Sequence, residues 1–245
     1  MDRMTGELVI GFDADDTLWE NETLFADVRE RFATMVGRYL DNGFDDSIAD
    51  RHATIERRNL ELFGFGVKSF TLSMIETAIE LTDGRIEAAD VHGIVSWGKD
   101  MLAHPHTLLP GVADVVGDLA SRHRLLLVTK GDLLHQETKV ARSGLADLFS
   151  AVEIVSDKSE STYASVLARH GVDPEEFVMV GDSVPSDVLP VLALGGTGVH
   201  IPAPIVWAHE RHDGPIEHDG YVRLESITEL PPFVASVAAR RGVAT

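Results

Sequence analysis

Three carboxylates and a hydroxyl lie within five consecutive residues near the start of the chain, in the segment Asp13-Ala14-Asp15-Asp16-Thr17. Carboxylates this close repel one another unless a cation or a shared proton compensates their charge. An acidic turn that caps the start of a helix would contain the same residue types. Taken alone, the segment leaves both interpretations open, a capping turn and a functional site.

Three later segments favour the functional site. Thr129 ends one apolar run and Lys130 comes after it, Lys158 follows a second run, and Asp182 follows a third with Asp187 five residues further on. Ligands of open α/β sheets bind outside the carboxyl ends of the strands, so parallel strands would bring these side chains to one crevice. Carboxylates, a hydroxyl and an ammonium around one point supply what phosphoryl transfer needs: a nucleophile, a cation site and donors for the phosphoryl oxygens.

The elements that would position these residues are read from apolar runs that alternate with helical patterns. Strand, helix, strand, helix at this spacing predicts an α/β fold with a Rossmann-like, doubly wound parallel sheet. An edge strand at Tyr221–Leu224 and a last helix over Ile227–Ala239 complete the expected core. The five principal predicted strands are Glu7–Phe12, Arg124–Thr129, Ala151–Val155, Phe177–Gly181 and Gly198–Ile201.

One segment interrupts this alternation. Between Trp19 and Thr107 no run is typical of a strand, and apolar residues such as Phe25, Val28 and Phe32 recur at the three- and four-residue steps of a helix. We therefore expect an α/β core made of residues 1–18 and 108–245, with an inserted all-helical domain at 19–107. Pro110-Gly111 marks the return to the core.

Composition narrows the possible functions. The 245 residues include 40 Asp+Glu against 21 Lys+Arg, a formal net charge of −19. A chain this acidic repels phosphate backbones and anionic lipid, so we expect no nucleic-acid partner and no membrane partner. The absence of cysteine excludes thiol nucleophiles and thiolate metal sites, and it fits a cytoplasmic location. The oligomeric state is left open by the sequence.

Taken together, these motifs resemble the haloacid dehalogenase superfamily of aspartate-nucleophile hydrolases, most of which are Mg²⁺-dependent phosphatases. Asp13, Asp15 and Thr17 match the family's first motif, Asp-x-Asp-x-Thr. The second motif is matched by Thr129 and the third by Lys158. The fourth, Gly-Asp followed by a further acid, is matched by Gly181, Asp182 and Asp187. The helical insertion at 19–107 stands where the family has its helical (type 1) cap.

The resemblance implies a role for each matched residue. Asp13 would be the nucleophile, and Asp15 would protonate the leaving alcohol and then take a proton from water. Mg²⁺ would be held by Asp13, the backbone carbonyl of Asp15 and Asp182, with Asp187 as a further ligand or as a residue that orients bound water. The phosphoryl oxygens would be held by Thr129 and Lys158. Lys130 stands where close relatives have Asn, so whether it shares the phosphate-binding role of Lys158 is open.

The function we expect is therefore a Mg²⁺-dependent phosphatase that hydrolyses a small phosphorylated metabolite through an aspartyl-phosphate. Within the superfamily, the dehalogenating branch lacks an Asp two residues after the nucleophile, and this chain has Asp15. A sugar-phosphate mutase or a dehalogenase of the same superfamily, or a non-catalytic module that binds a phosphorylated metabolite, are the alternatives. The cap residues that would select the substrate are not identified by the sequence.

Overall fold

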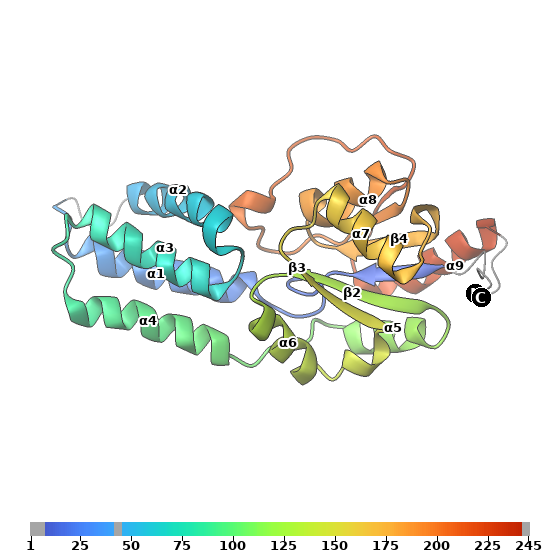
Figure 1. The fold of residues 1–245 in the computed structure, drawn as a ribbon, viewed down its shortest axis with the longest axis horizontal. Helices are drawn as coiled ribbons and strands as arrows, with labels where there is room; N and C mark the ends of the chain where they lie inside the picture. The colour runs from blue at the N-terminus through green and yellow to red at the C-terminus, as the bar shows by residue number, and fades with distance from the viewer. Residues whose placement is uncertain (1–7, 42–45, 242–245) are drawn as a thin grey trace. The chain divides into compact units, whose positions relative to one another are not determined.

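The structure of the protein is a computed structural model that describes residues 8–41 and 46–241. Six strands form one parallel sheet in the order β3-β2-β1-β4-β5-β6 (Figure 1). The predicted α/β fold with a doubly wound parallel sheet is confirmed; Glu7 of the first predicted strand lies outside the described residues. The strands are β1 (Val9–Phe12), β2 (Arg124–Lys130), β3 (Ala151–Val155), β4 (Phe177–Gly181), β5 (Thr197–His200) and β6 (Tyr221–Arg223).

Alternate residues of β1 pack on opposite faces of the sheet, as the two-residue period of a strand requires. Ile10 and Phe12 belong to an apolar cluster that includes α5 (Val112–Ala120) and α9 (Leu230–Arg241). Val9 belongs to the cluster on the other face, with α7 (Glu160–His170) and α8 (Leu189–Ala193). Because helices cover both faces, the central strands are apolar along their whole length rather than alternating.

The order in which strands are added to the sheet reverses at β1. From this strand, β2 and β3 extend to one side and β4, β5 and β6 to the other. Phe12, the last residue of β1, pairs with Leu127 of β2 and with Val180 of β4. The residues that follow these parallel strands therefore leave the sheet at the same edge, where ligands of open α/β sheets bind.

Two predicted helices differ in detail from the structure. The pattern over Val184–Leu194 forms a π-helical segment, η3 (Val184–Val188), followed by α8. The last helix is preceded by a 3₁₀ turn, η5 (Ile227–Glu229), before α9 begins at Leu230. Prolines at the start of η3 and α8 lack the N–H that an uninterrupted α-helix would use, which explains the first break.

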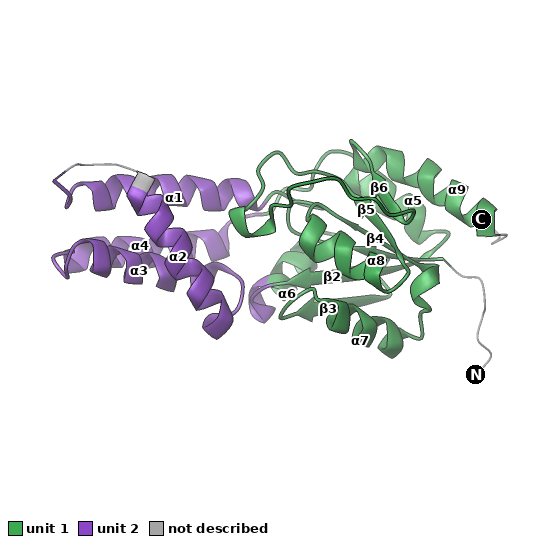
Figure 2. Cartoon of the chain, turned by 90° about the horizontal axis from the view of Figure 1, so that it is seen from above, with its two compact units in different colours: residues 1–20, 106–130, 136–245 green, residues 21–105, 131–135 purple. Residues whose placement is uncertain are grey.

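The chain divides into two compact units, coloured separately in Figure 2. The core unit consists of Met1–Glu20, His106–Lys130 and Gln136–Thr245, and the helical unit of Asn21–Pro105 and Gly131–His135. Within the described part of 21–105 there are four helices and no strand. These helices are α1 (Glu22–Gly37), α2 (Asp46–Phe63), α3 (Val67–Leu81) and α4 (Ala88–Ala103).

The helical unit has an apolar core of its own. Val28 and Phe32 of α1, Phe70 and Met74 of α3 and Ile94 of α4 are buried in one cluster. Their spacing of three or four residues within a helix places them on a single face, as the sequence pattern predicted. The domain boundaries predicted from sequence, 18/19 and 107/108, remain a prediction.

In the described ranges 8–41 and 46–241, no helix combines the length and the apolar character that crossing a bilayer requires.

Candidate active site

The segment after β1 turns back at once and brings its side chains together. The N–H of Asp13 donates to the carbonyl of Val180 over 2.8 Å, which continues the β1–β4 pairing by one residue. Asp16 then adopts a left-handed backbone conformation with φ of 60°, where Asp is tolerated better than most residues. The hydroxyl of Thr17 lies 3.2 Å from Asp13 Oδ2 and accepts the N–H of Asp182 over 3.1 Å. Thr17 therefore connects the ends of β1 and β4.

Three carboxylates meet at this point, from Asp13, Asp182 and Asp187. Each offers one oxygen, and these oxygens all lie within 4.8 Å of one another. The Asp187 carboxylate occupies the space beside Gly181, where a Cβ would lie only 2.2 Å from Asp187 Oδ2. The glycine that precedes Asp182 is thus required by the close approach of Asp187.

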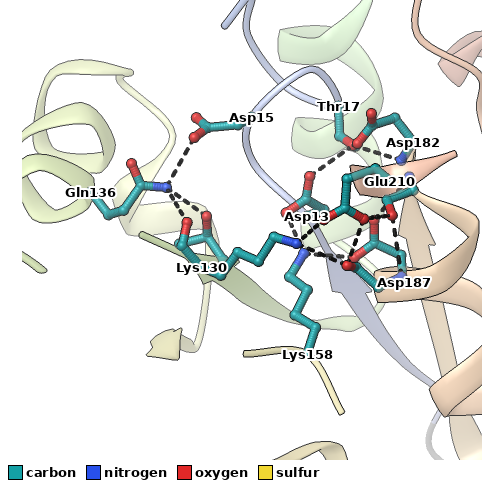
Figure 3. Close-up of polar contacts among 12 residues, drawn as sticks. Asp13, Asp15, Thr17, Lys130, Gln136, Lys158, Asp182, Asp187 and Glu210 are labelled. Carbon is teal, nitrogen blue, oxygen red and sulfur yellow. Dashed lines mark hydrogen bonds and ion pairs between the residues drawn. The ribbon is translucent and has the colours of Figure 1, made fainter. Parts of the chain in front are cut away.

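A buried lysine lies against this cluster (Figure 3). Lys158 Nζ lies 2.6 Å from Asp187 Oδ1 and also donates to Asp13 Oδ1. The phenol of Tyr163 donates to the same Asp187 oxygen over 3.4 Å. Lys158 comes from the turn between β3 and α7, so residues that follow β1, β3 and β4 contribute to the cluster, although β2 lies between β1 and β3.

Burial makes ionisation of Asp13 and of Asp182 more difficult. It raises the pKa of Asp13 to about 6, although the ammonium of Lys158 acts in the opposite direction. Burial, and then the neighbouring Asp13 and Asp187, raise the pKa of Asp182 well above its usual value. For Lys158 burial would lower the pKa, but the Asp13 and Asp187 carboxylates raise it well above the usual value. Clustered oxygen ligands whose charges repel are the donor set that a hard divalent cation takes, so the residues fit such an ion.

Asp15 lies in a second group of contacts. Its Oδ1 accepts the indole N–H of Trp19 over 2.6 Å, and Lys139 Nζ is 2.9 Å from both of its oxygens. Gln136 Nε2 donates to Asp15 Oδ2 over 3.3 Å, and Figure 3 shows the Asp15 carboxylate directed toward this amide. Burial would raise the pKa of Asp15. The charge of Lys139 and the hydrogen bonds from Lys139 and Trp19 outweigh this effect and lower the pKa below its usual value.

Thr129 belongs to the same group, since its hydroxyl accepts from Gln136 Nε2 over 2.7 Å. Lys130 lies in a third group, where its Nζ donates to Ser186 Oγ over 2.9 Å and forms an ion pair with Glu210. Glu210 also accepts from Ser186 Oγ over 2.7 Å and from the hydroxyl of Ser183. Burial would raise the pKa of Glu210, but the Lys130 charge lowers it.

The structure thus brings Asp13, Lys158, Asp182 and Asp187 into direct contact or close proximity, and places Asp15 and Thr129 together around Gln136. Sequence reasoning did not identify Gln136, Lys139 or Glu210. Gln136 and Lys139 carried one signal, a three-residue spacing on the helix α6 (Leu133–Arg142) that follows Thr129. Glu210, in the short 3₁₀ turn η4 (Ala208–Glu210), carried none.

Comparison with known proteins identifies the family of this chain. Residues 8–195 match the haloacid dehalogenase-like hydrolase family. The protein belongs to this family, as the motifs had indicated.

The chain is similar to several individual proteins. A haloacid dehalogenase-like hydrolase from Xanthomonas campestris is 40% identical, with a TM-score of 0.86 over 98% of this chain and 96% of that one. N-acylneuraminate-9-phosphatase from Rattus norvegicus is 28% identical over 58% of this chain, and the chain spans only 57% of that protein. A 2-haloacid dehalogenase from Pseudomonas syringae is 19% identical with a TM-score of 0.60 over 94% of this chain and 99% of that one, a likeness of fold alone.

Proposed function

We propose that this protein is a Mg²⁺-dependent phosphatase that hydrolyses a small phosphorylated metabolite through an aspartyl-phosphate on Asp13. The observation that carries the proposal is the separation of two nearby aspartates into different environments. Asp13 lies in the carboxylate cluster against Lys158, whereas Asp15 lies outside it, between Trp19 and Lys139. One site thus holds a carboxylate beside a candidate cation site and a second carboxylate suited to proton transfer.

The reaction begins with attack by Asp13. An Oδ atom of Asp13 forms a bond to phosphorus while the bond from phosphorus to the ester oxygen breaks, and Asp15 gives the leaving alcohol its proton. The Lys158 ammonium and the Thr129 hydroxyl are the donors for the phosphoryl oxygens. In the second half, Asp15 takes a proton from a water molecule whose oxygen attacks phosphorus. The bond from phosphorus to Asp13 then breaks, which releases phosphate and restores the Asp13 carboxylate and the protonated form of Asp15.

Asp13, Asp182 and the backbone carbonyl of Asp15 are the groups that would hold Mg²⁺, with Asp187 as a further ligand or as the residue that orients bound water. When bound, the ion supplies positive charge that lets one anion approach another. The charge of the cluster supports a divalent ion, because three carboxylates and the single ammonium of Lys158 leave two negative charges uncompensated when all are ionised.

The presence of Asp15 favours phosphate ester hydrolysis over dehalogenation, because expulsion of halide needs no proton donor at that position. The phosphatase among the relatives supports the same choice, and its name adds phosphorylated sugar acids to the substrates worth testing. A sugar-phosphate mutase shares the core chemistry and would be recognised by isomerised product instead of free phosphate. A cytoplasmic location remains a prediction.

The direct test is turnover by the purified protein with Mg²⁺. We expect inorganic phosphate from p-nitrophenyl phosphate, acetyl phosphate and at least one member of a panel of sugar phosphates, nucleotides and phosphoglycolate, and no halide from 2-haloacids. Asp13→Asn should abolish turnover, whereas Asp147→Asn, at an exposed position of the core unit, should not. Absence of phosphate release from every substrate would overturn the proposal, and tight ligand binding without turnover would favour a binding module.

A further inference from the structure

Two buried polar side chains on α6 (Leu133–Arg142) face Asp15. The Lys139 side chain is 2% exposed, and its Nζ is equidistant, at 2.9 Å, from the two Asp15 oxygens. Gln136, also 2% exposed, lies three residues earlier on the same face of the helix. Burying an ammonium costs free energy unless a well-placed carboxylate compensates its charge. For Lys139 that carboxylate is Asp15.

The Gln136 amide joins two parts of the site. Its Nε2 donates to Thr129 Oγ1 over 2.7 Å and lies 3.3 Å from Asp15 Oδ2. One side chain therefore fixes the proton-transferring carboxylate relative to the hydroxyl that is a candidate donor to the phosphoryl group. An error of about 1 Å in such a distance can reduce a rate about 100-fold.

All the contacts described for the Asp15 carboxylate come from N–H groups, those of Trp19, Gln136 and Lys139. Both oxygens thus accept hydrogen bonds, so the three donors fix the position and orientation of the carboxylate. A fixed orientation is what the second half-reaction needs, when Asp15 takes a proton from the water that attacks the aspartyl-phosphate on Asp13.

We propose that Lys139 and Gln136 are positioning residues that hold the Asp15 carboxylate for hydrolysis of the aspartyl-phosphate. The inference rests on the proposed function, because it assigns the two residues to one step of that reaction. Neither residue touches the reacting phosphorus; both act through the orientation of Asp15. Their loss should therefore slow breakdown of the phosphoenzyme more than its formation.

Pre-steady-state hydrolysis of p-nitrophenyl phosphate separates these two steps. The nitrophenolate leaving group needs little help from a proton donor, so the first turnover reports formation of the phosphoenzyme and the steady state reports its breakdown. We expect Lys139→Met to lower the steady-state rate about 10- to 100-fold, while a burst of nitrophenolate close to one per site remains and phosphorylated Asp13 accumulates. Lys99→Met, at an exposed position of α4, is the matched control and should behave as the wild type.

A purely structural role for Lys139 gives a different result. Partial unfolding would reduce burst amplitude and steady-state rate in the same proportion, and this outcome would overturn the inference. An unchanged steady-state rate in Lys139→Met would also overturn it. If the wild type itself forms no phosphoenzyme, the proposed function fails instead, so the two failures are distinguishable.

A double-mutant cycle tests whether Lys139 acts through Asp15. In an Asp15→Asn background, Lys139→Met should cost little further activity, because the group that it positions is already gone. Losses that multiply would contradict the inference. For Gln136, the same burst experiment with Gln136→Leu should give the same pattern with a smaller loss.

Chemical rescue gives an independent readout, because the chain contains no cysteine. Lys139→Cys introduces a single thiol, and alkylation with 2-bromoethylamine in denaturant, followed by refolding, restores an ammonium at nearly the native distance. The wild type carried through the same treatment is the control. Recovery of the steady-state rate after alkylation is expected, and no recovery in a refolded protein that still shows the burst would contradict a requirement for the ammonium.

Discussion

Lys158 Nζ lies 2.6 Å from Asp187 Oδ1, and both side chains are almost inaccessible to solvent, at 2% and 1% exposure. The same ammonium pairs with Asp13, so one buried cation is shared by the proposed nucleophile and an acid from the segment after β4. Removing one member of a buried ion pair leaves an uncompensated charge, which is more costly than never having formed the pair. We therefore expect Lys158 to contribute both to the stability of the folded protein and to the proposed reaction.

Replacement of Lys158 by methionine should affect both properties. With the metal chelated, we expect Lys158→Met to lower the free energy of unfolding by about 3–5 kcal/mol, because the buried carboxylates lose their ammonium. In the presence of Mg²⁺, kcat/KM for p-nitrophenyl phosphate should fall about 100- to 1,000-fold, because a donor to the phosphoryl oxygens is lost. Urea unfolding with EDTA and steady-state kinetics measure the two effects. If Lys158→Met were as stable as the wild type in EDTA, the Lys158 ammonium would not be needed to compensate the negative charge of the buried carboxylates.

The second prediction concerns Gly181, whose lack of a Cβ leaves space for the Asp187 carboxylate. In Gly181→Ala the new methyl would lie 2.2 Å from Asp187 Oδ2 and 2.3 Å from its Cγ, so the carboxylate must move. We expect the affinity for Mg²⁺ to fall about 10- to 100-fold, by analogy with other changes to groups that support metal ligands. Isothermal titration calorimetry with Mg²⁺ measures this directly.

Gly117→Ala is the matched control for this experiment. Gly117 lies inside α5, and an added Cβ there meets no atom within 4 Å. Alanine is favoured over glycine in a helix interior by about 1 kcal/mol, so this variant should bind Mg²⁺ normally and unfold at a slightly higher temperature. Equal Mg²⁺ affinity in both variants would show that Asp187 is not needed for the ion.

Much of the fold and part of the site could be predicted from sequence, for physical reasons. A strand buried on both faces is a continuous apolar run, as in β1 and β4, and parallel topology brings the residues after such runs to one edge of the sheet. Asp13, Lys158 and Asp182 each follow a strand closely, so predicting the strands was enough to predict their proximity.

The remaining residues depend on information that a strand pattern does not contain. Whether Gln136 and Lys139 face the sheet end or the solvent depends on how α6 is rotated about its axis, and both are ordinary polar residues of a helix. Glu210 reaches Lys130 from 80 positions further along the chain, through a segment without helical or strand periodicity. Contacts of this kind are set by tertiary packing and become visible only in the structure.

Glu210→Gln tests whether Lys130 contributes to phosphate binding. The substitution keeps the shape of the side chain but removes the charge that neutralises Lys130, so the ammonium becomes available to an anion. If Lys130 contacts the phosphoryl group, inorganic phosphate should inhibit the variant about tenfold more tightly than the wild type, a difference of about 1.4 kcal/mol. Glu217→Gln, an exposed change in the segment between β5 and β6, should leave the inhibition constant unchanged. An unchanged constant in Glu210→Gln would assign Lys130 a structural role.

The binding of Mg²⁺ should depend on pH, because the ion and protons compete for the same carboxylates. Burial raises the pKa of Asp13 to about 6 in the metal-free protein, and burial also raises the pKa of Asp182. A carboxyl whose pKa is higher in the folded than in the unfolded state binds its proton more tightly when folded. This contribution to stability is full below the unfolded pKa, near 4, and is lost as the pH rises through about 6.

Mg²⁺ requires the deprotonated carboxylates, so its binding must release these protons. Below pH 6, the apparent dissociation constant should therefore rise about tenfold per pH unit for each proton displaced. We expect saturating Mg²⁺ at one fixed concentration to raise Tm more at pH 8 than at pH 5, in paired measurements with EDTA. Asp182→Asn, which removes one of the titrating ligands, should show a smaller rise at pH 8. A rise in Tm that is the same at both pH values in the wild type would mean that Mg²⁺ does not bind at these carboxylates.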